Sequence, residues 1–158
     1  MSMNNIPFTI IQYNTHRSRD VVIADFLAKP EVSKADIIAV QEPWENPYND
    51  TTYHPLKQTH ELLFPSSAET GGGRARVCIY ISKRIGTNWT HYAHSEVCQE
   101  VRIQTGLGEI CFDNIYNECG TTGTVDLLSI VLEGSRKHTM IAGDFNLHHP
   151  AWGGIEAI

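Results

Sequence analysis

The beginning of the chain alternates apolar and polar segments in an order that predicts two strands joined by a helix. Segments 8–14 (FTIIQYN) and 35–42 (ADIIAVQE) are short apolar runs that end in polar residues, which is typical of buried strands. Between them we expect a helix that Ser18 or Asp20 caps, that ends at Pro30, and whose apolar face consists of Val22, Ile23, Phe26 and Leu27. A strand–helix–strand order predicts neighbouring parallel strands.

The middle of the chain predicts strands separated by loops. Residues 43–58 contain three prolines, and residues 66–75 contain a triple glycine, so both segments are expected to be loops. Short apolar and β-branched runs predict strands at 59–65, 76–83, 88–93, 99–105 and 109–116. Residues 106–108 (GLG) fit a hairpin turn between the last two of these strands.

The remaining elements complete a mixed architecture. We expect a helix at 124–133, which Thr124 caps and Gly134 follows, and then a final buried strand at 138–144 (HTMIAGD). The order of strands and helices predicts an α/β sandwich of two sheets, and the length fits a single domain over residues 1–158.

Polar side chains of one chemical kind follow four of the predicted strands. Asn14 ends the first strand, Glu42 the second, Tyr116 a later one, and Asp144 with Asn146 the last. In open α/β sheets, ligands bind beyond the carboxyl ends of the parallel strands, so we expect these side chains to share one site. Each is weak evidence alone, because polar residues often end a strand as solvated turn formers.

The residue types in this predicted site suit phosphate chemistry with a metal ion. Carboxylate and amide oxygens are the ligands that Mg²⁺ and Mn²⁺ prefer. An aspartate can orient and deprotonate a water molecule, and asparagine and tyrosine can donate hydrogen bonds to a phosphoryl oxygen. Arg74 and Arg76 flank the glycine-rich loop and either contact a phosphate backbone or lie solvated in the loop.

The overall composition narrows the class of protein. The chain is 41% hydrophobic and 19% charged, with a formal net charge of −6, which indicates a globular fold rather than disorder. An acidic chain is atypical of general DNA-binding domains, yet a carboxylate cluster attracts divalent cations that can face a phosphate. There is no apolar run of the ~20 residues that a membrane helix needs and no signal-peptide pattern, so we expect an intracellular protein, nuclear or cytoplasmic, with unpaired buried cysteines.

The motifs around these residues resemble a known enzyme superfamily. The sequence contains Q-x-N at 12–14, Q-E at 41–42, N-I-Y-N at 114–117 and G-D-F-N at 143–146. This series resembles the endonuclease/exonuclease/phosphatase superfamily, and GDFNLHHPAWGG looks most like the apurinic-type endonuclease domain of LINE-like (non-LTR) retrotransposons. The resemblance implies a DNase I-like two-sheet sandwich that nicks DNA by Mg²⁺-dependent phosphodiester hydrolysis, in a parent polyprotein with a reverse transcriptase.

The resemblance also implies a role for each residue of the predicted site. Glu42 would be the principal metal ligand with help from Asn14 and Asp144, and Asp144 would also orient and activate the attacking water. Asn146 would contact the scissile phosphate, and Tyr116 would hydrogen-bond a phosphate oxygen. Further phosphate contacts are expected from Asn117, Arg74 and Arg76.

The sequence departs from the family pattern in two places. Cys119 stands where the family commonly has an asparagine, and the family's Ser-Asp-His motif is not present. The domain is therefore expected to be C-terminally incomplete, with impaired activity and exposed sheet edges that favour a homodimer or a domain swap. Two alternatives remain open: a non-catalytic remnant that acts as a binding or assembly module, and a phosphatase or phosphodiesterase of the same superfamily.

Overall fold

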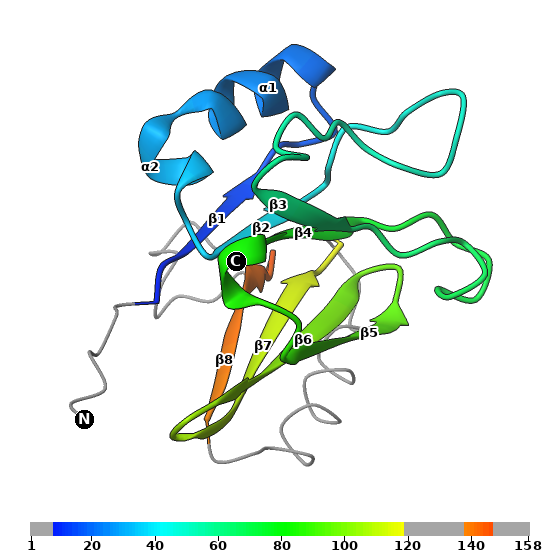
Figure 1. Cartoon of the computed structure of the whole chain (residues 1–158). Helices are drawn as coiled ribbons and strands as arrows, with labels where there is room; N and C mark the ends of the chain where they lie inside the picture. Colours follow the sequence, from blue (N-terminus) through cyan, green and yellow to red (C-terminus); the bar gives the residue numbers. More distant parts are fainter. Residues whose placement is uncertain (1–7, 119–137, 147–158) are drawn as a thin grey trace, which may run out of the picture.

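Two four-stranded sheets pack face to face, and helices cover the outer face of the first sheet (Figure 1). The computed structural model describes residues 8–118 and 138–146. The first sheet has the order β1-β2-β4-β3, with β1 at Ile10–Asn14, β2 at Ile37–Gln41, β3 at His60–Leu63 and β4 at Val77–Ser82. The second has the order β5-β6-β7-β8, with β5 at Trp89–Ser95, β6 at Cys98–Thr105, β7 at Gly108–Tyr116 and β8 at Thr139–Asp144. The predicted sandwich class is confirmed.

The remaining described elements are short. Helices α1 (Asp20–Ala28) and α2 (Pro30–Ser33) connect β1 to β2, and a 3₁₀ turn, η1 (Lys83–Ile85), follows β4. The helix predicted at 124–133 lies outside the described residues. None of the helices in the described part has the length and apolarity to cross a bilayer.

Each sheet contains one parallel pair of strands, and these pairs determine where the strand ends meet. Strand β1 pairs with β2 in parallel, as the strand–helix–strand pattern predicted, and β7 pairs with β8 in parallel. The other strand pairs are antiparallel. In both parallel pairs the last residues of the two strands are register partners, Asn14 with Gln41 and Tyr116 with Asp144.

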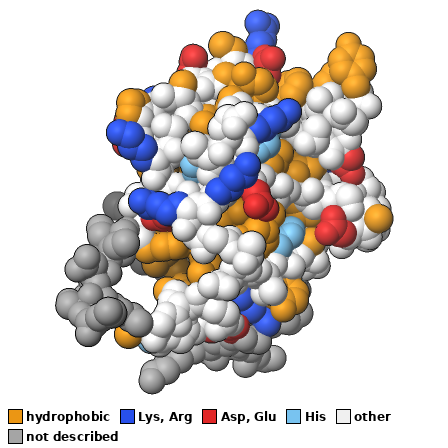
Figure 2. All heavy atoms as spheres, in the orientation of Figure 1, with side chains coloured by type: hydrophobic (Ala, Val, Ile, Leu, Met, Phe, Trp, Pro, Cys, Tyr) orange, Lys and Arg blue, Asp and Glu red, His pale blue; other side chains and the backbone are white. Residues whose placement is uncertain are grey.

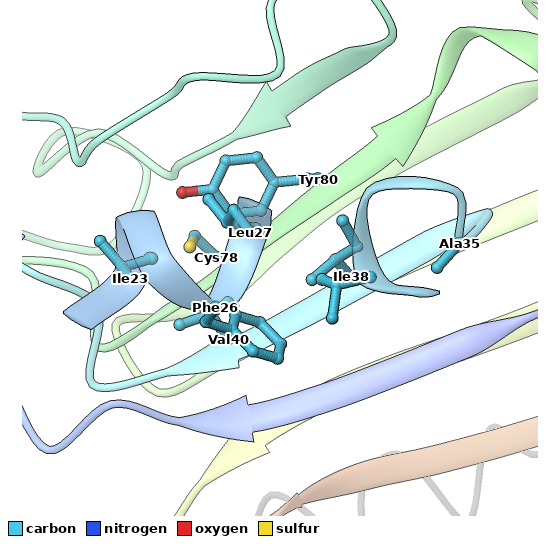
Figure 3. Close-up of a cluster of buried hydrophobic side chains, with 9 residues drawn as sticks. Ile23, Phe26, Leu27, Ala35, Ile38, Val40, Cys78 and Tyr80 are labelled. Atoms are coloured by element: carbon cyan, nitrogen blue, oxygen red, sulfur yellow. The ribbon is translucent and has the colours of Figure 1, made fainter. Parts of the chain in front are cut away.

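The first hydrophobic core lies between helices α1 and α2 and the first sheet. Figure 3 shows Ile23, Phe26 and Leu27 of α1 lying against side chains from β2 and β4. The cluster is completed from α2, the connection that follows it and the strands by Val32, Ala35, Ile38, Val40, Cys78 and Tyr80. Alternate residues of β2 face the helices, because successive side chains in a strand point to opposite faces.

The second core lies between the two sheets. Ile37 and Ala39 of β2 are completely buried there, with Val101, Ile103 and Phe112 contributed by the second sheet. Every residue of β2 is therefore buried on one face or the other, which explains why its sequence is a continuous apolar run.

Several local predictions need correction. Strands β1 and β8 were expected to be buried, but each is the outermost described strand of its sheet and is only half-buried, with Tyr13 and Met140 exposed. An apolar run does not reveal whether a strand is central or outermost. Neither Ser18 nor Asp20 is the N-cap residue of α1: that residue is Arg19, whose side chain makes no capping bond. The Asp20 carboxylate instead accepts from the amide of Val21 inside the first turn.

The surface is mixed in character on the side shown in Figure 2. Lys and Arg side chains lie mainly on the upper half of this view, over the first sheet and its helices, with acidic and hydrophobic side chains between them. The described cysteines Cys78, Cys98 and Cys111 are buried and none of them is in a disulfide, as predicted.

Candidate active site

The ends of the four parallel-paired strands meet at one end of the sandwich. The amide Nδ2 of Asn14, at the end of β1, donates to Oδ2 of Asp144, at the end of β8, over 2.5 Å. This hydrogen bond joins the two sheets, and the residues that it joins are 130 positions apart in the chain. The structure therefore brings together Asn14, Glu42, Tyr116 and Asp144, as the strand-end argument predicted.

The backbone of Glu42 is held in an unusual conformation directly after β2. Its φ is 48°, in the left-handed region that residues with a Cβ enter at a cost of about 1 kcal/mol or more. Three hydrogen bonds fix this turn: the Glu42 carbonyl accepts from the Thr15 hydroxyl at 2.5 Å and the Arg17 amide at 2.9 Å, and the Glu42 amide donates to the Arg76 carbonyl at 2.8 Å. These bonds offset the local strain and hold the backbone that carries the Glu42 carboxylate at the site.

The carboxylate of Glu42 is partly buried but well supplied with donors. Its side chain is 12% exposed, and Arg76 donates to Oε1 at 2.7 Å. Burial alone would raise the pKa of Glu42, but hydrogen bonds from Arg76, Tyr116 and Asn14 and the charge of Arg76 outweigh it and lower the pKa. Glu42 is therefore a stable anion at neutral pH.

Tyr116 and Arg76 form the wall of the site next to Glu42. The Arg76 guanidinium lies over the Tyr116 ring, 4.6 Å from its centroid, and also approaches Glu118 at 3.5 Å. Burial and the hydrogen bond to Glu42 raise the pKa of the Tyr116 hydroxyl, so this group is a proton donor at neutral pH. Arg76 therefore binds protein groups on three sides.

The segment after β8 folds back onto the end of β7. Asn117 donates from its backbone amide to the Asp144 carbonyl and from its side chain to the Phe145 carbonyl, both at 2.7 Å. The Asn146 side chain in turn donates to the Asn117 carbonyl at 2.6 Å, and the Asn146 amide donates to Asp144 Oδ1 at 3.2 Å. These bonds hold Asn146 in the left-handed conformation, with φ at 43°.

Gly143 allows Asp144 to reach this position. A Cβ at residue 143 would overlap the backbone of Ile115, its register partner on β7. Any side chain there would push β8 away from β7, and Asp144 would move with it. The glycine of the G-D-F-N motif is thus required by strand packing.

A pair of buried amides lies beneath the site, between the sheets. Gln41 donates from Nε2 to Oδ1 of Asn114 at 2.6 Å, and Asn114 donates to the carbonyls of Cys78 and Val40 at 3.0 and 3.3 Å. Both amide side chains are at most 1% exposed. They connect β2 and β4 to β7 at the level of the site.

Arg74 is not brought together with the other predicted residues. Its guanidinium donates to the carbonyls of Asn46, Asn49 and Thr51, at 2.7 to 3.5 Å, and so ties down the loop before β3. A phosphate contact by Arg74 stays a prediction that this arrangement does not favour.

Sequence reasoning missed two features of the described residues. The pairing of Arg76 with Glu42 was not foreseen, although a cation directly before β4 was a visible signal. A second polar cluster was also missed: His94, Glu100 and Asp113 offer ligand atoms that all lie within 4.8 Å of one another on the second sheet. The available signal was Asp113, an acidic residue inside the apolar strand segment CFDNI. Arg102 forms an ion pair with Glu100 of this cluster.

The class of protein to which this fold belongs is shown by a comparison with protein families. A model of the Endonuclease/Exonuclease/phosphatase family matches residues 11–156. The chain therefore belongs to this family. Comparison with curated protein sequences gives no significant match.

Solved structures support the fold assignment. The endonuclease domain of TRAS1, a telomere-specific non-LTR retrotransposon, is 19% identical, with a TM-score of 0.69, and the match covers 93% of this chain and 64% of that one. D. rerio TDP2 complexed with a single-strand DNA product is 12% identical (TM-score 0.54; 90% and 62% covered). The human Nocturnin catalytic domain with bound sulfate is 13% identical (TM-score 0.55; 91% and 66% covered). This chain thus spans just under two thirds of the length of these structures, and identities this low show the fold alone.

Proposed function

We propose that the site around Glu42 and Asp144 hydrolyses phosphodiester bonds of DNA and that the protein is a nicking endonuclease of a LINE-like retrotransposon. The observation that carries the proposal is the contact of Asn14 with Asp144 beside Glu42. It assembles oxygen ligands from both sheets at the carboxyl ends of parallel strands, where α/β folds bind ligands. The similarity to the TRAS1 endonuclease domain supports the retrotransposon assignment.

The residues present fit a divalent metal ion. Arg76 pairs with Glu42 at 2.7 Å and approaches Glu118 at 3.5 Å, and the His16 imidazole lies 3.5 Å from Glu42. Asp144, bonded to Asn14, adds a third carboxylate, so the carboxylates outnumber the one arginine and the local charge is negative. Carboxylate and amide oxygens from Glu42, Asn14 and Asp144 would hold Mg²⁺, or Mn²⁺ in its place. When bound, the ion would neutralise charge that develops on the phosphate.

The protein residues would then divide the remaining work. Asp144 would orient a water molecule and accept its proton, which is typically worth 10²–10⁴-fold in rate. Tyr116, kept protonated next to Glu42, would donate to a phosphate oxygen. Asn146 and Asn117, whose side chains currently bind backbone carbonyls, would contact the phosphate after exchanging these partners.

The proposal includes the setting of the enzyme. DNA would be the substrate and a polyprotein with a reverse transcriptase the parent, so the protein would act inside the cell, in the nucleus or the cytoplasm. Pairing of two copies through β1 or β8, the half-buried outermost described strands, would bring further residues to the site.

Nicking of supercoiled plasmid tests this function. We expect Mg²⁺- or Mn²⁺-dependent nicking that EDTA abolishes, and a loss of about 10²–10⁴-fold in Asp144→Ala and Glu42→Ala. Glu61→Gln changes an exposed acidic residue on β3 and is the matched control, which should nick DNA as well as the unsubstituted chain, called the parent below. Nicking that survives in both site variants would overturn catalysis by this site. A folded chain without nicking would favour the binding or assembly module, and cleavage of soluble phosphomonoesters but not DNA would favour a phosphatase.

A further inference from the structure

We propose that His94, Glu100 and Asp113 form a second metal site, which binds a divalent ion of the Zn²⁺ class on the second sheet. The three side chains come from neighbouring strands β5, β6 and β7, and their ligand atoms all lie within 4.8 Å of one another. Glu100 and Asp113 are direct register partners, and like charges directly opposite one another destabilise a sheet unless a cation joins them.

The burial of Asp113 without a hydrogen-bond partner indicates that its carboxylate binds a ligand. It is 1% exposed, and neither of its carboxylate oxygens has a hydrogen-bond partner in the described structure. Buried carboxylates are normally paired, hydrogen-bonded or bound to a metal, because removing an anion from water is costly. An ion held by Asp113 and its two neighbours would satisfy both oxygens.

His94 is placed toward the carboxylates by an irregularity of β5. Ala93 pairs with Gln99 and Ser95 with Cys98, so His94 is the extra residue of a β-bulge. Bulges redirect a side chain, and here His94 Nε2 lies 3.3 Å from Glu100 Oε2. Two ligands at ~2.0–2.1 Å from a tetrahedral Zn²⁺ are separated by roughly the same distance. The His94 side chain is 34% exposed, which leaves a route for an ion to enter.

The remaining contacts of the cluster suit an ion of this kind. Arg102 donates to Glu100 Oε1 and lies over the Tyr92 ring, 4.2 Å from its centroid, so it orients Glu100 while Oε2 stays directed at His94. The three groups and Arg102 carry one net negative charge when His94 is neutral, and a divalent ion would reverse it. One imidazole and two carboxylates favour Zn²⁺ over Mg²⁺, which prefers oxygen ligands alone.

This site is separate from the proposed catalytic one. Asp113 precedes Tyr116 by three residues on β7, roughly 10 Å along the strand. Successive side chains of a strand point to opposite faces of the sheet. Phe112, which lies on the same face of β7 as Tyr116, packs into the core between the sheets, so Asp113 lies on the opposite face. The ion would join three strands and act on stability, without touching DNA at the strand ends.

Zinc titration of the whole chain tests the proposal. Excess Mg²⁺ would occupy the proposed catalytic site, and Zn²⁺ binding would be measured by calorimetry in the parent, His94→Ala, Asp113→Asn and the exposed control His138→Ala. We expect one Zn²⁺ site that weakens tenfold or more in the first two variants and is unchanged in the control. Zinc should raise the Tm of the parent and the control but not of the two variants.

Cobalt spectroscopy gives a second measurement that is independent of nuclease activity. Co²⁺ in the parent should show the visible absorption of a tetrahedral site, and this band should be absent in Asp113→Asn. Circular dichroism in EDTA establishes whether each variant is folded. If His94→Ala does not fold, the proposal is judged on Asp113→Asn alone, because asparagine keeps the shape of the aspartate side chain. Equal Zn²⁺ affinity in the parent and a folded Asp113→Asn, or no Zn²⁺ binding by the parent, would overturn the proposal.

Discussion

Glu42 and Asp113 are both acidic residues on the central strands of this sandwich or directly after them, but their surroundings are opposite. Glu42 is bonded by Arg76, Tyr116 and Asn14, and its pKa is lowered in spite of burial. Asp113 has no hydrogen-bond partner among the described residues, and burial together with the charge of Glu100 raises its pKa to about 6. Burial therefore does not determine the charge of a carboxylate; the donors that come with burial do.

The largest expected effect on stability comes from removing Arg76, the donor that the Glu42 carboxylate has and the Asp113 carboxylate lacks. Arg76→Met would leave the partly buried Glu42 without its main partner, with only Tyr116 and Asn14 as donors, and should destabilise the fold by about 3 kcal/mol at pH 7. In the parent, a lowered pKa adds stability above the ordinary pKa of Glu, and this is lost as pH falls. In the variant the pKa would be raised, so the free energy of unfolding should instead fall as pH rises from 4 to 7.

Urea unfolding at several pH values measures this reversal. Arg17→Met is the matched control, because Arg17 pairs with Glu45 at 3.7 Å on the surface, where an ion pair contributes about 0–1 kcal/mol. An Arg76→Met variant whose stability keeps the parent's pH dependence would show that Arg76 is not what keeps Glu42 ionised.

The next effect concerns Asp113 in metal-free protein. Between its ordinary pKa and about 6, the folded chain binds a proton that the unfolded chain does not, so parent stability should fall as pH rises through this window. Asp113→Asn removes this dependence. In EDTA it should be more stable than the parent by on the order of 2 kcal/mol at pH 7.5 and nearly equal to it at pH 4.

Thermal unfolding of the parent and Asp113→Asn at the two pH values checks this. Asp25→Asn, on the exposed side of α1, controls for the loss of one negative charge at the surface and should change stability by less than ~0.5 kcal/mol. The quantity to compare is the stability difference between the parent and Asp113→Asn at pH 4 and at pH 7.5. If this difference is the same at both pH values, Asp113 is ionised and stabilised by a contact outside the described residues.

The smallest effect tests a single donor to Glu42. Tyr116→Phe keeps the ring under Arg76 but removes the hydroxyl, so it should destabilise the fold by about 1 kcal/mol and shift the pKa of Glu42 upward. An NMR titration of the Glu42 carboxyl group measures the shift directly. Tyr48→Phe, at a residue that is 92% exposed, should leave both quantities unchanged. An unmoved Glu42 titration in Tyr116→Phe would remove the tyrosine from this network.

The gathering of Asn14, Glu42, Tyr116 and Asp144 was predictable because it depends on the local order of residues along the chain. Asn14, Glu42, Tyr116 and Asp144 each end an apolar run, and the ends of parallel strands gather at one edge by geometry alone. The exposure of β1 and β8 was not predictable, since strand order within a sheet is not encoded in a single run. The cluster of His94, Glu100 and Asp113 depends on the register of three strands and on one bulge, and no spacing in the sequence records either.

The hydrogen bond between Asn14 and Asp144 has a consequence for how the molecule unfolds. Because the two residues belong to different sheets, whatever binds both of them favours the state in which the sheets are docked. A ligand at a hundred times its Kd would add about 2.7 kcal/mol to the free energy that separates docked from open sheets. Ligand-bound protein should then unfold in one cooperative step. The ligand-free sandwich has one fewer link between its sheets, so amide hydrogens of β1 and β8 should exchange faster without ligand than with it.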